Sequence, residues 1–355
     1  MGFAVQDGHQ AGMWSAFQLL GGAAALGRPT SRRFDWQGAT TQRFERALLS
    51  WDAGADGARI VALDEFQPRE LPAAATAPEY RPAVEADAAR TAWSGWWWPT
   101  WERLGPTLTG GEGPLMKYDR YVALATGERT RAWDWERLTN YFPGNQWAGH
   151  CNGWAAAALL EQEPTAARSL LGVTFSVADL KGLLSYYHFA DAAAWSHGNG
   201  SVDPADFHRV LLNWLGGPER RGFVLTFDMG RGETWSYPVY RFTSSWQMDP
   251  DVVGRWQVRT TVWMADMDVA PGFVGVRPYP GPAGKSFEYT IEGDPWDPTT
   301  GWWTGPSAQG RFAHPGRIWY PDPTTQNLDN HWISPDLDRG TLENILGRRL
   351  GQAAR

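Results

Sequence analysis

A run of aromatic residues, Trp93-Ser-Gly-Trp96-Trp97-Trp98-Pro99-Thr-Trp101, is the strongest constraint on how this chain can fold. Each indole ring buries a large apolar area and carries one hydrogen-bond donor. Such a segment cannot stay in water, so we expect it to pack against the body of the protein. The chain of 355 residues has 23 tryptophans in all. This number predicts an aromatic-rich core, a broad aromatic groove for a peptide or sugar, or both.

The composition and the net charge limit the class of protein. Hydrophobic residues make up 43% and charged residues 20%, which excludes disorder as the dominant state. The net charge of −7 argues against a nucleic-acid partner, which would require a basic face. No stretch of about 18 apolar residues predicts a membrane span, and residues 19–26 make a poor secretory signal. Secretion and a cytoplasmic location both stay open, and we expect a monomer.

The order of the predicted elements indicates an α+β fold, with a helix-rich part packed on a mainly antiparallel sheet. Helical patterns cover residues 115–125, 133–141, 151–161, 177–188 and a segment that opens at 203–204. Strand patterns follow at residues 222–228, 235–242, 255–264, 286–292 and 301–304, the last two paired across a turn at 294–297. Pro238 favours an edge position for the strand that contains it.

The only cysteine, Cys151, lies where a glycine-containing loop meets an alanine-rich predicted helix. One cysteine excludes an intramolecular disulfide and a cysteine-rich zinc site, and a lone cysteine is usually an inert buried residue. At a helix N-terminus, however, the macrodipole favours the thiolate, and unpaired N–H groups can hold an oxyanion. Papain-like enzymes use this arrangement, so Cys151 is a candidate nucleophile.

Two residues downstream are candidates for the other catalytic roles. His208 follows Cys151 in the chain, and Asp228 ends the apolar run that begins at Gly222. The order Cys, His, Asp is that of papain-like and transglutaminase-like folds, although those folds place the histidine on a strand and His208 has a helical pattern. A half-buried histidine with satisfied hydrogen bonds is the alternative interpretation. His150 adjoins Cys151, but neighbouring residues on a helix face apart, so we expect a local polar neighbour.

A series of linked motifs covers residues 93–323. In chain order the motifs are Trp96-Trp-Trp98-Pro99, Lys117-Tyr-Asp119, Gly149-His-Cys151-Asn-Gly-Trp154-Ala155, Gly172-Val-Thr-Phe175 with Asp179-Leu-Lys181, Pro204-Ala-Asp-Phe207-His208 with Asn213-Trp-Leu-Gly216, Glu233-Thr-Trp235-Ser-Tyr-Pro238-Val239, Tyr289-Thr-Ile-Glu292, His314-Pro315 and Trp319-Tyr320-Pro321. With these motifs the chain resembles the transglutaminase elicitor family, the oomycete-type protein-glutamine γ-glutamyltransferases with bacterial relatives. It departs from the family at Ser236-Tyr237, where the family has Asn-Gln.

The resemblance implies acyl transfer from glutamine side chains. The Cys151 thiolate would attack the γ-carboxamide and ammonia would leave. The thioester would pass to a lysine or other primary amine, or to water. His208 would shuttle protons and Asp228 would orient it. The Cys151 N–H and a donor such as Gln146 would hold the oxyanion.

Trp147 and Trp154 flank the nucleophile in the sequence and are candidates for the wall of a substrate channel. Excluding water would favour transfer to an amine over deamidation. The expected partners are a glutamine donor and a primary-amine acceptor. Two alternatives stay open: a papain-like cysteine peptidase or glutamine deamidase with the same catalytic residues, and a non-catalytic, aromatic-rich binding protein.

We expect the chain to have three parts, of which the resemblance implies the second. Residues 1–90 are expected to be an N-terminal helical and extended segment, a candidate regulatory region, with helical spacing over 43–51 and a proline-rich connector over 67–91. Residues 91–325 would form the catalytic transglutaminase-like domain. Residues 326–355 would form a C-terminal tail with a short helix.

Two further features bear on cofactors and substrates. Calcium is a candidate because related enzymes bind it, and acidic segments at 249–251, 266–268 and 294–297 could supply the oxygen ligands. None of these segments has EF-hand spacing. Solvated loops are the alternative interpretation. No other metal is expected. Lys117, Lys181 and Lys285 are the chain's only lysines. Their scarcity fits an enzyme that avoids crosslinking itself, and codon usage explains it equally well.

Overall fold

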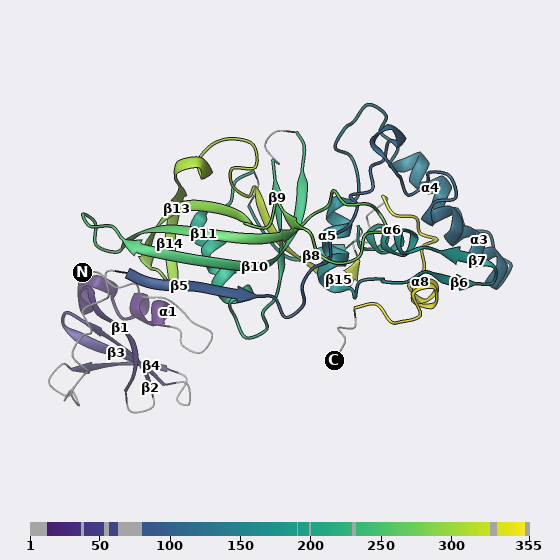
Figure 1. Cartoon of the computed structure of the whole chain (residues 1–355). Coiled ribbons are helices and arrows are strands. Elements are labelled where there is room, and N and C mark those ends of the chain that lie inside the picture. The colour runs from purple at the N-terminus through teal and green to yellow at the C-terminus, as the bar shows by residue number, and fades with distance from the viewer. Residues whose placement is uncertain are drawn as a thin grey trace. The chain divides into compact units, whose positions relative to one another are not determined.

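The computed structural model describes residues 13–36, 39–52, 57–62, 80–189, 191–198, 200–228, 232–326 and 332–351. The chain divides into two compact units (Figure 1). Unit 1 comprises Met1–Pro82, Trp246–Val258 and Thr290–Gly301. Unit 2 comprises Ala83–Ser245, Arg259–Tyr289 and Trp302–Arg355, and it contains Cys151. The predicted boundaries at residues 90 and 325 stay a prediction.

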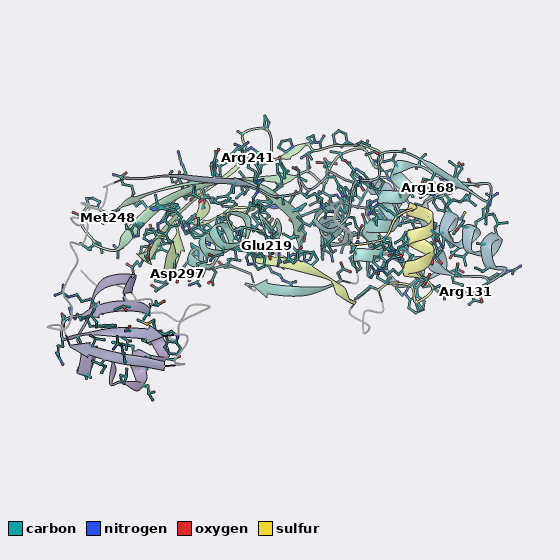
Figure 2. All side chains as sticks on the ribbon, turned by 90° about the horizontal axis from the view of Figure 1, so that it is seen from below. Arg131, Arg168, Glu219, Arg241, Met248 and Asp297 are labelled. Atoms are coloured by element: carbon teal, nitrogen blue, oxygen red, sulfur yellow. The ribbon has the colours of Figure 1, made fainter. Side chains whose placement is uncertain are left out.

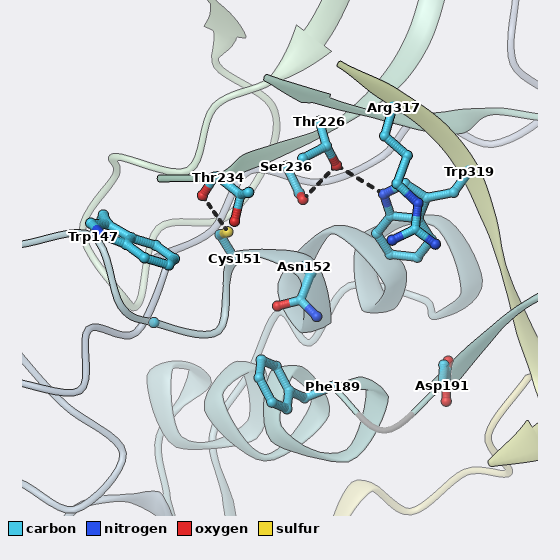
Figure 3. Close-up of a pocket in the computed structure, with 11 residues that line it drawn as sticks. Trp147, Cys151, Asn152, Phe189, Asp191, Thr226, Thr234, Ser236, Arg317 and Trp319 are labelled. Carbon is cyan, nitrogen blue, oxygen red and sulfur yellow. Dashed lines mark hydrogen bonds between the residues drawn. The ribbon is translucent and has the colours of Figure 1, made fainter. Parts of the chain in front are cut away.

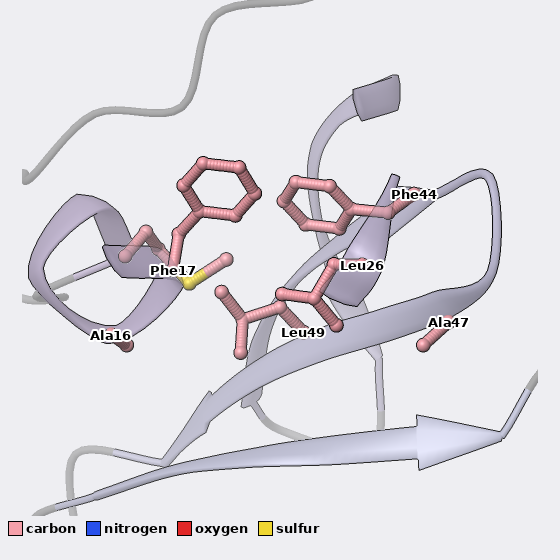
Figure 4. Close-up of a cluster of buried hydrophobic side chains, with 7 residues drawn as sticks. Ala16, Phe17, Leu26, Phe44, Ala47 and Leu49 are labelled. Carbon is pink, nitrogen blue, oxygen red and sulfur yellow. The ribbon is translucent and has the colours of Figure 1, made fainter. Parts of the chain in front are cut away.

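The N-terminal part of unit 1 is a small antiparallel sheet with two short helices. The helices are α1 (Met13–Leu19) and α2 (Gly22–Leu26), and the strands, in sheet order, are β1 (Pro29–Trp36), β2 (Ala39–Phe44), β3 (Ala47–Asp52) and β4 (Gly57–Ala62). The core of this part consists of Met13, Ala16, Phe17, Leu26, Phe44, Ala47 and Leu49 (Figure 4). The rings of Phe17 and Phe44 stack at 5.1 Å.

The helix expected over residues 43–51 is wrong, because β2 and β3 occupy this range. Strand β3 lies between β2 and β4 in the sheet. Leu48 and Leu49 are both fully buried, although adjacent strand residues point to opposite faces. A short apolar run buried on both faces cannot be told from a helix segment by its periodicity.

The second sheet is larger than the N-terminal one. The sheet order is β14 (Asp297–Trp303), β13 (Lys285–Asp294), β11 (Arg255–Ala265), β10 (Trp235–Met248), β9 (Phe223–Phe227), β15 (Arg317–Gln326) and β8 (Asp191–His197). In addition, β12 (Pro278–Tyr279) pairs with β11, and β5 (Tyr80–Asp87) pairs with β10. Strand β9 is antiparallel to both β10 and β15. This arrangement confirms the α+β class and the strands predicted at 222–228, 255–264 and 286–292.

Pro238 does not mark an edge strand, so that expectation is wrong. Strand β10 lies between β9 and β11, and Pro238 itself pairs with Val224 of β9. A proline removes one donor from the ladder. One missing donor in a strand of 14 residues does not remove that strand from the sheet.

The helices of unit 2 follow the sequence pattern closely. They are α3 (Pro114–Thr126), α4 (Ala132–Thr139), α5 (Cys151–Leu160), α6 (Val177–His188), α7 (Pro204–Val210) with a π-helical turn at Leu211–Leu215, and α8 (Arg339–Leu346). A short hairpin of β6 (Arg168–Leu170) and β7 (Val173–Phe175) precedes α6, and 3-10 turns cover Glu102–Leu104 and Gly305–Ser307. Among the described residues, none of these helices is both long and apolar enough to cross a membrane.

Two local features explain how α5 and α6 form and pack. Ser176 and Asp179 make a capping box, in which the Ser176 side chain accepts the Asp179 N–H and the Asp179 carboxylate accepts the Ser176 N–H. At Gly153 of α5, a Cβ atom would lie 2.1 Å from the Ser185 carbonyl oxygen of α6. Only glycine permits this close approach between the two helices.

The tryptophan-rich segment packs on unit 2, which confirms the expectation. Trp93, Trp97 and Trp98 are buried, whereas charged residues such as Arg131 and Glu219 are exposed (Figure 2). The indole N–H of Trp93 donates to a backbone carbonyl at 3.1 Å. These tryptophans are therefore part of the core.

All three lysines have defined surroundings. The Nζ atom of Lys117 lies 2.6 Å from Asp179 Oδ2. The Nζ atom of Lys181 lies 2.6 Å from Glu163 Oε1 and also donates to two backbone carbonyls, at 3.0 and 2.6 Å. The Nζ atom of Lys285 lies 5.8 and 5.3 Å from the centroids of two phenylalanine rings. Burial lowers the pKa of both Lys181 and Lys285.

Candidate functional site

Cys151 is the first residue of α5, and the preceding loop is held in place by local hydrogen bonds. The Asn145 side chain accepts the N–H groups of Trp147 and Ala148, both at 3.0 Å. At Gly149 a Cβ atom would lie 2.6 Å from the ring of Trp97. The tryptophan-rich segment therefore forms the surface against which the loop before the cysteine rests.

The Cys151 thiol faces a cavity of about 340 Å³ (Figure 3). The lining residues come from the loop before α5, the first turn of α5, the end of α6, and the strands β8, β9, β10 and β15 or the residues next to them. They are Trp147, Gly149, Cys151, Asn152, Phe189, Asp191, Thr226, Thr234, Ser236, Arg317 and Trp319. The wall combines aromatic rings with hydroxyl, amide and charged groups, which is typical of a small-molecule or side-chain binding site.

Burial dominates the electrostatics of the thiol. It raises the pKa of Cys151, and hydrogen bonds from Ser236 and Asn152 reduce this rise without cancelling it. The thiol also lies 3.8 Å from the Thr234 carbonyl oxygen, to which it donates. Desolvation of the charge thus opposes the stabilisation of the thiolate that we expect from the helix N-terminus.

Strand register places polar groups from three strands side by side in the cavity. Thr226 of β9 pairs with Ser236 of β10 on one side and with Arg317 of β15 on the other. The Thr226 Oγ1 atom lies 2.9 Å from Ser236 Oγ and accepts the Trp319 indole N–H at 3.0 Å. Burial lowers the pKa of Arg317.

A buried ionic cluster adjoins the cavity at the end of α6. Asp191, which lines the cavity, has its Oδ2 atom 2.6 Å from His188 Nδ1. His188 Nε2 lies 3.2 Å from Glu161 Oε1, and Glu161 Oε2 lies 2.7 Å from Arg348 Nη1. Burial by itself would lower the pKa of His188, but the two carboxylates raise this pKa to about 9.

Of the three residues predicted to hold the oxyanion or substrate, the structure places one at the cavity. Trp147 lines it. Gln146 is exposed and is not among the lining residues. Trp154 is fully buried within α5, and a Cβ atom on Gly95 would lie 2.2 Å from its indole nitrogen. The Trp154 side chain thus packs in the hydrophobic core next to α5.

His208 lies on α7, is fully buried and is not among the residues that line the Cys151 cavity. Its Nδ1 atom lies 2.8 Å from the Tyr289 hydroxyl oxygen of β13, which in turn lies 2.8 Å from Thr260 Oγ1. This contact fits the alternative interpretation of a buried histidine with a hydrogen-bond partner. A catalytic role for His208 stays a prediction.

Asp228 and His150 also have partners other than the thiol. Asp228 Oδ2 lies 3.1 Å from Arg311 Nε, and Asp228 Oδ1 accepts the Phe312 N–H at 3.0 Å. Neither contact orients a histidine. His150 Nε2 lies 3.3 Å from Glu136 Oε1; burial opposes protonation, but this carboxylate raises the pKa of His150. His150 thus has a polar partner other than the thiol, and the expectation that it is not the base stays a prediction.

The described residues contain no group of three or more His, Cys, Asp and Glu side chains that could hold a metal ion. In the acidic loops, Asp249, Asp266 and Asp294 accept backbone N–H groups two residues further on, at 2.9, 3.0 and 3.0 Å. These carboxylates stabilise turns. Binding of calcium stays a prediction.

Comparison with known proteins gives two matches. The family model for the transglutaminase elicitor family matches residues 138–199. A solved structure, the GP42 transglutaminase from Phytophthora sojae, is similar with a TM-score of 0.49 and 20% identity, over 74% of this chain and 90% of that chain. A search of curated proteins gives no match. For the segment that carries Cys151, the family model thus confirms the resemblance of this chain to the transglutaminase elicitor family.

Proposed function

We propose that the protein is a protein-glutamine γ-glutamyltransferase that uses Cys151 as its nucleophile. The observation that carries this proposal is the position of the thiol: it lies at the N-terminus of a buried helix and faces a cavity lined by indole, hydroxyl and amide groups. The family match over residues 138–199 supports it.

The proposed reaction proceeds through a thioester. The Cys151 sulfur attacks the glutamine γ-carbonyl carbon, and the negative charge collects on the carbonyl oxygen. The C–N bond then breaks, and the amide nitrogen takes up the proton that the thiol gives up and leaves as ammonia. A primary amine attacks the thioester, forms the isopeptide bond and releases the thiol; attack by water gives glutamate instead.

The oxyanion requires donors near the sulfur. The Cys151 N–H lies at the start of α5 and is one candidate. Asn152, whose side chain lines the cavity (Figure 3), is a better candidate for the second donor than the exposed Gln146. No histidine is among the residues found to line the cavity. The experiment below therefore includes a variant of the predicted general base, His208.

The proposal is tested by incubating the protein with a glutamine-containing protein and a fluorescent primary amine, while ammonia release is measured in parallel. We expect incorporation by the wild type and none by Cys151→Ala, because the thioester cannot form without the sulfur. His208→Ala in the same assay tests the predicted base, and added calcium or chelator tests the predicted ion.

The outcomes separate the alternatives. Ammonia release without amine incorporation would indicate a glutamine deamidase, and cleavage of the protein substrate would indicate a peptidase. Equal incorporation by the wild type and by Cys151→Ala would contradict the proposal.

One observation favours a second candidate, a non-catalytic binding protein with an aromatic cavity. Burial raises the pKa of Cys151, and a protonated thiol is a poor nucleophile. Alkylation by iodoacetamide at neutral pH distinguishes the two candidates. A thiol that reacts supports catalysis, whereas a thiol that stays inert in the folded protein and reacts after unfolding supports the binding protein.

A further inference from the structure

Three side chains from three neighbouring strands form a hydrogen-bonded series that leads to the thiol. Trp319 of β15 donates its indole N–H to Thr226 Oγ1 of β9 at 3.0 Å, and this oxygen lies 2.9 Å from Ser236 Oγ of β10. Ser236 and Cys151 line the same cavity. Burial raises the pKa of the Cys151 thiol, and the N–H and hydroxyl of Ser236 counteract this rise. Figure 3 shows the Ser236 side chain between the thiol and Thr226.

The chemistry of these groups favours one direction for the series. An indole nitrogen can only donate, so the Thr226 oxygen accepts from Trp319. The single Thr226 hydroxyl hydrogen is then best used on the Ser236 oxygen. Donation in this direction leaves the Ser236 hydrogen available to the Cys151 sulfur, which lines the same cavity.

Burial strengthens the hydrogen bonds in this series. The exposed fractions of Thr226, Ser236 and Trp319 are 6%, 4% and 7%, so water competes little for their hydrogen bonds. A donor to a buried anion forms a charge-assisted bond, which is about twice as strong as a bond between neutral groups. Such a donor offsets part of the cost of desolvating the thiolate.

We propose that Ser236 is the residue that activates Cys151, through a hydroxyl hydrogen bond to the sulfur, and that Thr226 and Trp319 are positioning residues that orient this hydroxyl. Ser236 occupies the position where the resembling family has asparagine, whose amide also presents a donor. The role in catalysis rests on the proposed acyl transfer. The stabilisation of the thiolate does not.

The test is the pH dependence of the alkylation rate by iodoacetamide, which reports the thiol pKa without ambiguity because Cys151 is the only cysteine. The variants are Ser236→Ala, Thr226→Val and Trp319→Phe. We expect the thiol pKa to rise by about one unit in Ser236→Ala, which corresponds to a roughly tenfold slower reaction below the pKa. Thr226→Val and Trp319→Phe should shift it in the same direction by less.

Ser244→Ala is the matched control. Ser244 is also a buried serine of β10 with a threonine hydroxyl of the neighbouring strand, Thr260, at 2.7 Å, but it does not line the Cys151 cavity. Its pH profile should match that of the wild type. Urea unfolding of each variant checks that the fold is retained.

The outcomes decide each part separately. A Ser236→Ala profile that superposes on the wild-type profile would overturn the proposal, and so would an equal shift in Ser244→Ala. An unchanged profile in Thr226→Val would reject the positioning role of the series. If the thiol pKa shifts as expected but no variant or wild type incorporates an amine, then the proposed acyl transfer fails and the inference about Ser236 stands.

Discussion

Gly149 shows how a residue without a side chain sets the position of the thiol. A Cβ atom at this position would lie 2.6 Å from the Trp97 ring and 2.9 Å from the Trp97 carbonyl oxygen. Contacts this short require the loop or the indole to move. The loop geometry that presents Cys151 thus depends on a contact with a residue more than fifty positions earlier.

We predict that Gly149→Ala lowers the free energy of unfolding by about 1–3 kcal/mol, the usual cost of overpacking. Urea unfolding followed by tryptophan fluorescence measures this change. Gly272→Ala is the control, since a Cβ atom there meets no atom within 4 Å. Equal stability of the two variants would show that the loop accommodates a methyl group at residue 149.

At this scale the sequence identifies Cys151 and Trp147 but neither the surroundings of His208 nor the roles of Thr226 and Ser236. The first two follow from a local pattern, a loop that leads into a helix. The partner of His208, Tyr289, comes from a distant strand, and single-sequence patterns do not determine such contacts. Thr226 and Ser236 meet through strand register; the one signal was a hydroxyl residue inside the apolar run 222–228.

At the level of secondary-structure elements, His188 joins α6 to α5 and β8 through the carboxylates of Glu161 and Asp191. Its pKa in the folded protein, about 9, lies above the ordinary value of 6.5. The protonated ring therefore stabilises the fold fully below pH 6.5, and this contribution is lost as the pH rises toward about 9.

We predict that the free energy of unfolding falls over this pH range by up to about 3 kcal/mol, from the linkage between pKa and stability. His188→Gln should remove most of this dependence. His314→Gln is the control, because the His314 ring contacts Ser201 and Ser307 instead of carboxylates. A wild-type stability that stays constant between pH 6.5 and 9 would contradict the prediction.

Elements defined by local chemistry are the ones that the sequence predicts well. The helix α6 has its predicted bounds, since a capping box at Ser176 fixes its start. The errors at β3 and at Pro238 concern strands whose position depends on which strands pair with them. A pairing partner is a property of the sheet and leaves little trace in the strand's own residues.

At the scale of the whole molecule, the predicted order of helices followed by strands is enough to predict the α+β class. The division into two units cannot be predicted from the order of the residues. Unit 1 combines the N-terminal region with two segments, 246–258 and 290–301, that are far away in the chain. Contacts between distant segments have no compositional signature. The three-part division by residue number could therefore not anticipate this grouping.

The lysines give a prediction at the same scale. Lys181 is fully buried with its amine on Glu163, while the Lys117 side chain is 22% exposed and pairs with Asp179. We predict that an amine-reactive ester labels Lys117 slowly and Lys181 only after unfolding, as measured by mass spectrometry of native and urea-treated protein. Labelling of Lys181 at the same rate in both samples would contradict this.

The placement of these amines has a practical consequence for anyone who handles the protein. A short lysine-containing peptide fused to the chain would carry side-chain amines that are more accessible than those of Lys117 and Lys181. If Cys151 transfers acyl groups as proposed, the protein would form isopeptide bonds between the lysines of such a tag and a support that carries glutamine side chains. The tagged chain would then become attached to the support, while the untagged chain would stay in solution.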